Sequence, residues 1–138
     1  MKYLLDANVW LAPMTGGANA NEAEELIRKA PPSSLASTDF VLHTLGIVLT
    51  SMNKLDAFRK ILDDLARRKV WTLHLPPSDL YTVLDRMSAL NLDFDDAFQY
   101  LVAERDDLTI VSFDTDFDRT PRGRKTPGQV LAEIGAAG

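Results

Sequence analysis

The sequence has no cysteine and only two histidines among its 138 residues. Disulfide bonds and thiolate metal sites are therefore excluded. No apolar run approaches the roughly 20 residues that a membrane-spanning helix needs. Near the N-terminus only a Tyr-Leu-Leu stretch separates Lys2 from Asp6, which is too short for the apolar core of a signal peptide. We therefore expect a cytoplasmic protein with no membrane partner.

The sequence also lacks net positive charge. Its formal net charge is −5, which argues against broad, nonspecific coating of nucleic acid. Residues 93–118 contain nine acids and one base, whereas residues 119–125 contain four bases and no acid. An acidic cluster beside a basic strip is compatible with a cation site next to a phosphate-binding edge. It is equally compatible with a solvated loop of mixed charge.

Short β-rich segments alternate with helical patterns along the chain. Strands are predicted at residues 2–5, 35–37, 70–75 and 108–113. Helices are predicted at residues 19–30, 38–51, 54–68 and 94–105, with another after Ser78 and a short one from Thr126 that ends before Gly135. This alternation implies an α/β domain of three layers, with a central, mainly parallel sheet flanked by helices. No repeat or internal boundary divides the sequence, so residues 1–138 are expected to form a single domain.

Two of the predicted strands end at an aspartate, Asp6 and Asp114. Parallel strands place their carboxyl ends at one edge of the sheet, where ligands of open α/β sheets bind, so these two residues are expected to meet. Asp116 lies two residues after Asp114, and Asp96 lies in the first turn of the helix that precedes the last strand. The sequence therefore predicts a group of carboxylates at this edge.

Carboxylates held this close together repel one another, by about 1 kcal/mol per pair at 4 Å in water and about 4 kcal/mol at an intermediate dielectric constant. Protons or a divalent cation must neutralise them. Oxygen ligands without a histidine or cysteine cluster favour Mg²⁺ or Mn²⁺ over zinc. Such an ion activates water and neutralises charge on a phosphodiester.

Each aspartate also has a purely structural interpretation. Asp6 could cap the segment that begins at Ala7, and acids near residue 96 are favoured by the start of a helix. The spacing does not choose between Asp95 and Asp96. Asp114, Asp116 and Asp118 could form an ordinary turn. An aspartyl-nucleophile phosphohydrolase is a weaker alternative, because such enzymes usually carry Asp-x-Asp near the N-terminal strand.

Two stretches of the chain resemble PIN domains. The opening LLDANVWL is similar to the first strand and aspartate of that family, and LDFDDAFQYLVAERDDLTIVSFDTDFD is similar to its second hallmark. PIN domains are metal-dependent ribonucleases, and many are VapC-type toxins that are paired with an antitoxin. The resemblance therefore implies a PIN-like fold, RNA as substrate, an antitoxin as partner and a homodimer as a common assembly.

By this resemblance Asp6, Asp96 and Asp114 bind Mg²⁺ or Mn²⁺, and Asp116 is an auxiliary fourth carboxylate. Asn8 and Ser112 would form hydrogen bonds around them. The candidate phosphate contacts are Arg119, Arg122, Arg124 and Lys125, and the sequence does not distinguish among them.

One position departs from the family pattern. The segment ASTDFVLHTLGIVL places His43 where the family usually has a glutamate. His43 could bind metal, contact phosphate when protonated, or stay outside the site. Loss of a carboxylate weakens a Mg²⁺ site, so the alternative function is a catalytically weak or silent PIN-fold module that binds RNA or a protein partner.

Overall fold

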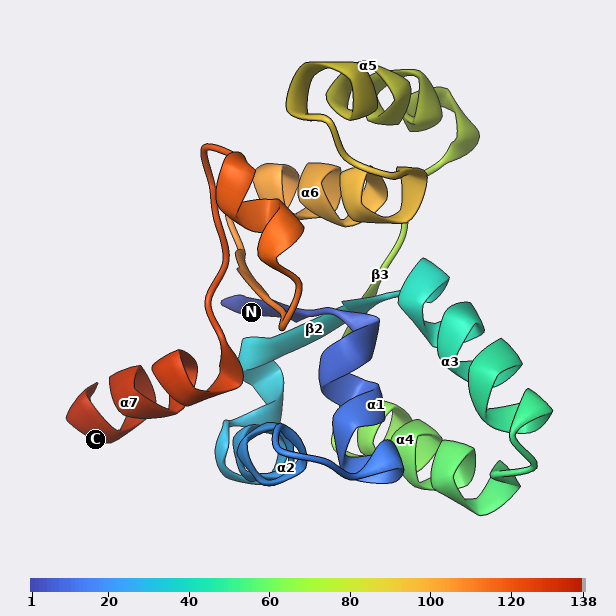
Figure 1. Ribbon diagram of the computed structural model, residues 1–138, viewed down its shortest axis with the longest axis vertical. Coiled ribbons are helices and arrows are strands. Elements are labelled where there is room, and N and C mark those ends of the chain that lie inside the picture. The colour runs from blue at the N-terminus through green and yellow to red at the C-terminus, as the bar shows by residue number, and fades with distance from the viewer. Residues whose placement is uncertain (138) are drawn as a thin grey trace.

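Four short strands form one sheet in the computed structural model, which describes residues 1–137 (Figure 1). The strands are β1 (Tyr3–Leu5), β2 (Leu35–Thr38), β3 (Trp71–Leu73) and β4 (Thr109–Val111). Their order is β3-β2-β1-β4, and every neighbouring pair is parallel. The chain steps outward from β1 to β3 and then returns to place β4 on the other side of β1. The strand order therefore reverses between β1 and β4, which is where open α/β sheets bind ligands.

Helices cover both faces of the sheet, as Figure 1 shows. One face carries α1 (Ala7–Thr15), α2 (Ala20–Lys29), α3 (Asp39–Ser51), α4 (Leu55–Arg67) and α7 (Pro127–Ala137). The other carries α5 (Leu80–Leu90) and α6 (Phe94–Asp106). Short 3₁₀ turns lie at η1 (Pro32–Ser34), η2 (Pro77–Asp79) and η3 (Thr115–Arg119). The predicted three-layer α/β architecture with a parallel central sheet is confirmed.

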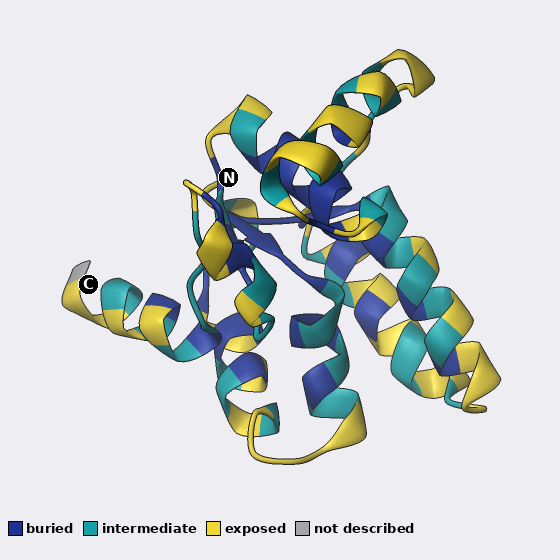
Figure 2. Cartoon of the chain, turned by 45° about the horizontal axis from the view of Figure 1, so that its top comes forward, coloured by how far each residue is buried: buried dark blue, intermediate teal, exposed yellow. Residues whose placement is uncertain are grey.

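The alternation of side chains along β1 divides the core into two clusters. Tyr3 and Leu5 pack into the cluster beneath α1 to α4, whereas Leu4 packs into the cluster beneath α5 and α6. Figure 2 shows the buried residues concentrated along the sheet and on the helix faces that meet it. Because β1 is buried on both faces, the residue that follows it is held in a rigid frame.

The predicted elements match the observed ones to within a few residues, with two exceptions. Helix α1 was not predicted, because its apolar residues cover most of its circumference and Pro13 lies inside it, so no helical period is visible. Gly135 was expected just past the last helix, but α7 continues through it to Ala137. That expectation was wrong, because a single glycine lowers helix stability by only about 1 kcal/mol and no proline follows it.

No helix among the described residues is both long and apolar enough to cross a membrane.

Replacing Leu4 with alanine should lower the free energy of unfolding by about 2–5 kcal/mol, because this side chain is fully buried in the middle of the sheet. The matched control is Leu84→Ala, since Leu84 is 54% exposed on α5. That control should change stability by no more than about 0.5 kcal/mol. Urea unfolding of the two variants measures the difference, and equal losses would contradict the described core.

Candidate metal centre

The carboxyl ends of β1 and β4 bring Asp6 and Asp114 to the same edge of the sheet. Leu5 pairs with Val111 in the parallel register, and the Asp6 amide donates a hydrogen bond of 2.9 Å to the Val111 carbonyl. The chain continues from β4 through Ser112 to Asp114, at the start of η3. Residues that are over 100 positions apart thus lie side by side.

Three carboxylates form the centre of this edge. Oxygen atoms of Asp96, Asp114 and Asp116 all lie within 4.8 Å of one another. Asp96 comes from the first turn of α6, and the other two come from the segment that follows β4. Opposite ligands of an octahedral Mg²⁺ ion are about 4.2 Å apart. This all-oxygen donor set therefore fits one hard dication.

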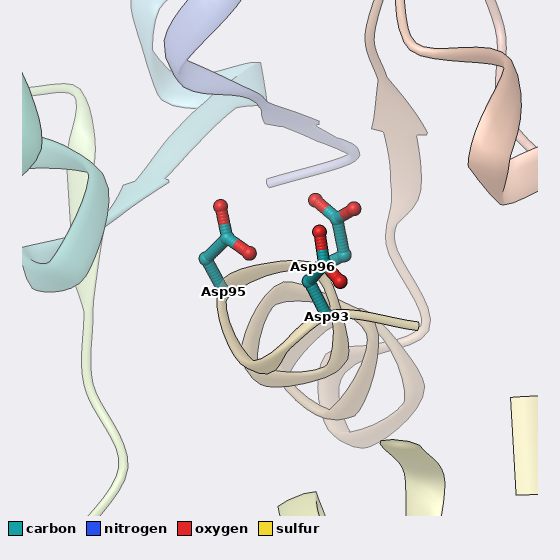
Figure 3. Close-up of side chains that lie close together, drawn as sticks. All are labelled: Asp93, Asp95 and Asp96. Carbon is teal, nitrogen blue, oxygen red and sulfur yellow. The ribbon is translucent and has the colours of Figure 1, made fainter. Parts of the chain in front are cut away.

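A second group of acids shares Asp96. Asp93, Asp95 and Asp96 also have oxygens within 4.8 Å of one another, and Figure 3 shows the three at the start of α6. Asp93 and Asp95 are exposed, whereas Asp96 is buried and also belongs to the group with Asp114. The structure thus distinguishes Asp96 from Asp95, which the spacing of the sequence left open.

Asp6 lies beside the three-carboxylate group but is not a member of it. Its carboxylate is buried and accepts several hydrogen bonds: Oδ1 accepts from the Ala7 amide at 2.7 Å and from Gln99 Nε2 at 2.9 Å, and Oδ2 accepts from Ser112 Oγ at 2.7 Å. Burial raises the pKa of Asp6, the Asp114 charge adds to this, and the three hydrogen bonds oppose it. Asp6 is therefore held in place mainly by hydrogen bonds.

One hydroxyl group joins the two aspartates that follow β1 and β4. Ser112 Oγ donates to Asp6 Oδ2 and accepts from the Asp114 amide at 2.9 Å. Asn8 supports this contact, because its Nδ2 donates to Ser112 Oγ at 3.2 Å and its Oδ1 accepts from the Phe113 amide at 3.2 Å. Asn8 and Ser112 thus form hydrogen bonds around the predicted carboxylates, and their role toward a metal stays a prediction.

The surroundings of Asp96 disfavour its ionised form. Burial, followed by the charges of Asp95, Asp6, Asp114 and Asp116, raises the pKa of Asp96 to about 7. Without a cation, this carboxyl group is therefore about half protonated at neutral pH. A bound dication would replace that proton and lower the pKa.

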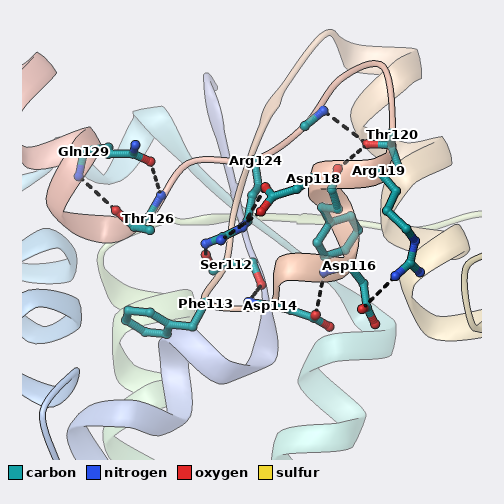
Figure 4. Close-up of polar contacts among 12 residues, drawn as sticks. Ser112, Phe113, Asp114, Asp116, Asp118, Arg119, Thr120, Arg124, Thr126 and Gln129 are labelled. Carbon is teal, nitrogen blue, oxygen red and sulfur yellow. Dashed lines mark hydrogen bonds and ion pairs between the residues drawn. The ribbon is translucent and has the colours of Figure 1, made fainter.

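Two of the structural roles considered for the aspartates are also present. Asp6 caps α1 through its bond from Ala7, and Asp114 Oδ1 accepts from the Asp116 amide at 2.8 Å (Figure 4). The second cap uses one oxygen of Asp114. Capping therefore orients the Asp114 carboxylate and is compatible with metal binding by its other oxygen.

His43 lies away from the grouped carboxylates. It is exposed on α3, where it lines a shallow groove with Ile47, Phe58 and Leu62. Neither acidic group in the described part of the chain includes it. The suggested role of His43 beside the metal stays a prediction.

The basic strip that follows the acids is paired internally. Arg122 binds Asp107 at 2.8 Å, Arg124 binds Asp118 at 3.1 Å, and Lys125 binds Glu133. Arg119 binds Asp116 at 3.1 Å and also donates to the Asn91 carbonyl at 2.7 Å. Figure 4 shows the contacts of Arg119 and Arg124. Among these four bases, Arg119 alone is paired with one of the grouped carboxylates.

Gln99 is a contact of the site that sequence analysis missed. It lies three residues after Asp96, so both side chains project from the same side of α6. A polar residue inside the run AFQYLVA, at helical spacing from a candidate ligand, is the signal that would have revealed it.

Comparison with known proteins agrees with this geometry. The model of the PIN domain family matches residues 3–123, so the chain belongs to the PIN domain family. No curated protein matches the sequence.

Solved structures share the fold. PAE2754 from Pyrobaculum aerophilum is 22% identical, with a TM-score of 0.73 over 99% of this chain and 96% of that one. A toxin–antitoxin complex from Klebsiella pneumoniae contains a chain that is 19% identical, with a TM-score of 0.72 over 91% of this chain and 98% of that one. VapC20 of Mycobacterium tuberculosis, a toxin that cleaves the sarcin-ricin loop, is 19% identical, with a TM-score of 0.72 over 85% and 93% of the two chains.

The raised pKa of Asp96 makes the stability of the metal-free protein depend on pH. The native state holds the Asp96 proton more tightly than the unfolded chain does. The protonated carboxyl group therefore contributes fully to the free energy of unfolding below about pH 4, and this contribution is lost as pH rises through about 7. For a shift of this size the loss is at most about 4 kcal/mol, and screening by solvent lowers it. Asp96→Asn should remove the loss and make the variant more stable than wild type at pH 8.

The matched control is Asp95→Asn, because this neighbouring acid is exposed. It should retain most of the wild-type slope. Urea unfolding in EDTA at several pH values gives the slopes, and identical slopes for wild type and Asp96→Asn would refute the assignment.

Proposed function

We propose that this protein is a metal-dependent endoribonuclease that hydrolyses RNA phosphodiesters with Mg²⁺ or Mn²⁺. The observation that carries the proposal is the convergence of Asp96, Asp114 and Asp116 within 4.8 Å at the reversal of strand order in a PIN-family chain. A single hard cation would neutralise these carboxylates, and hydrolysis of a phosphodiester is a reaction that such ions promote.

The residues of the site have separable roles in this proposal. Asp96, Asp114 and Asp116 would hold the ion. Asp6, which follows β1, would provide a further carboxylate beside it. When bound, the ion supplies an activated water and neutralises charge on the phosphate. Ser112 holds Asp6 and Asp114 in fixed relation through its hydroxyl group. Asp96 would release its proton to solvent on binding an ion, so ion affinity should rise with pH up to about 7.

Arg119 is the base best placed to contact the RNA phosphate. Its side chain is 47% exposed and its guanidinium already touches Asp116 at the rim of the site. Arg124 is only 14% exposed and donates to the Ser112 carbonyl, so its position supports the backbone. With Asp116 holding an ion, the Arg119 guanidinium would be available to a phosphate oxygen.

The likeness to solved toxins supports a biological setting for this activity. The Klebsiella pneumoniae structure is a toxin–antitoxin complex, and VapC20 is a toxin that cleaves the sarcin-ricin loop. We propose accordingly that this chain is a cytoplasmic toxin with RNA as substrate and an antitoxin as protein partner. A homodimer is the further assembly that we expect.

A second candidate function rests on His43. This residue is exposed on α3 and lies outside both acidic groups of the described chain, so the centre has no carboxylate from that helix position. A site with fewer acids binds a dication more weakly. The chain would then be a weak or silent PIN-fold module that binds RNA or a protein.

Cleavage distinguishes the two functions. Purified protein with single-stranded RNA and Mn²⁺ should produce fragments, and Asp114→Asn should lower the rate by more than about 100-fold, because a direct carboxylate contributes more than the 10–100-fold typical of outer contacts. Gel electrophoresis of labelled RNA measures both rates. RNA left equally intact by the two proteins supports the binding module.

Thermal melting of the same samples provides the control for metal binding. Mn²⁺ at about 100 times its dissociation constant should add roughly 2.7 kcal/mol, a shift in Tm on the order of 5–15 °C. Asp114→Asn should lose most of the shift. If that variant responds to Mn²⁺ as strongly as wild type, the ion binds elsewhere.

Replacing Arg119 with glutamine should lower the rate of RNA cleavage about 10–100-fold, the loss expected for one hydrogen bond to a charged group. The matched control is Arg122→Gln, since Arg122 is paired with Asp107 and does not contact the grouped carboxylates. Cleavage rates at saturating Mn²⁺ provide the comparison. Equal effects of the two substitutions would remove Arg119 from the proposed phosphate contact.

A further inference from the structure

Gln99 places a polar amide in the buried face of α6. The residue is 3% exposed, and its neighbours on α6 from Ala97 to Ala103 are buried as well. Burying an amide is unfavourable unless its polar atoms find partners. The contacts of this side chain therefore indicate why a polar group lies here.

The amide of Gln99 has one hydrogen-bonding partner among the described residues. Nε2 donates to Asp6 Oδ1 at 2.9 Å, whereas Oε1 is buried and accepts no hydrogen bond. A half-satisfied amide is less favourable in a core than an apolar side chain of the same length. Packing alone thus favours methionine or leucine at this position, and the contact with Asp6 is what the amide adds.

The hydrogen bond joins two elements that carry like charges. Asp6 follows β1, and Gln99 lies on α6 one helical turn from Asp96. The Asp6 and Asp96 charges repel, and the Asp6 charge contributes to the raised pKa of Asp96. A neutral donor from α6 attracts the Asp6 carboxylate without adding charge. It bonds to Oδ1, whereas Ser112 bonds to Oδ2.

We propose that Gln99 is a positioning residue of the metal centre, which orients the Asp6 carboxylate toward the ion held by Asp96, Asp114 and Asp116. The proposal rests on the metal-dependent function proposed above. Gln99 acts through Asp6 and contacts neither the ion nor the RNA. Outer hydrogen bonds of this kind set the orientation of a ligand and so contribute to the affinity for the metal.

The test is the Mn²⁺ affinity of Gln99→Met, a variant that keeps the length of the side chain and removes its donor. Isothermal titration calorimetry should show affinity about 10–100-fold weaker than wild type. The matched control is Leu101→Met, which places the same side chain at a buried position of the same helix. This control should bind Mn²⁺ as wild type does. Melting of the metal-free proteins shows whether each variant is folded.

A second measurement uses the wild-type protein, so the test does not depend on the variant. In ¹H–¹⁵N spectra, the side-chain NH₂ signals of Gln99 should shift as Mg²⁺ is added, and they should saturate together with the backbone signal of Asp114.

The outcomes separate the two proposals. Wild type that binds Mn²⁺ no better than Gln99→Met, or Gln99 signals that stay fixed while Asp114 responds, would overturn the role of Gln99 and leave the metal centre standing. Wild type that binds no Mn²⁺ at all would overturn both. Weaker binding by Gln99→Met, with Leu101→Met unchanged, supports the positioning role.

Discussion

The parallel pairing of β1 with β4 is the contact on which the candidate site depends. It joins the first strand of the chain to the last through the register of Leu5 with Val111, and the Asp6 amide extends the ladder by one more hydrogen bond. Because both strands are buried, the two aspartates that follow them cannot separate to relieve their repulsion. The fold thereby brings several negative charges close together, and the surrounding residues stabilise them by hydrogen bonds or by an ion pair.

The carboxylates of the site differ in how many hydrogen bonds and ion pairs stabilise them. Ser112, Gln99 and Ala7 donate hydrogen bonds to Asp6, whereas burial and then the neighbouring negative charges act against ionisation of Asp96. Neutral hydrogen-bond donors therefore hold the Asp6 carboxylate in position, whereas ionisation of Asp96 is disfavoured. On the solvent side, the ion pair of Arg119 with Asp116 offsets part of the negative charge. A cation bound among the three carboxylates would neutralise the negative charge that Arg119 leaves.

The sequence was sufficient to predict the layers of the fold and the meeting of Asp6 with Asp114, because both follow from strands that end at an aspartate in a parallel sheet. It could not separate Asp95 from Asp96, since both lie in one helical turn and the difference arises from how α6 packs on the sheet. Helix α1 was not predicted because apolar residues occupy most of its circumference, which removes the amphipathic period. The contact of Gln99 with Asp6 spans 93 residues, and a local pattern cannot reveal it. The sequence also did not predict the ion pairs of the basic strip, because the path of the loop determines which acid lies beside each base.

The two edges of the sheet differ in a way that bears on self-association. Beyond β4, the Lys125 segment covers the edge, with its amide bonded to the Ile110 carbonyl and its carbonyl accepting from the Ser112 amide. Beyond β3, the edge is open but only three residues long, and Pro76 and Pro77 follow it closely. Proline and short length both hinder the addition of a further strand. Extension of the sheet from one copy of the chain to the next is therefore disfavoured at both edges.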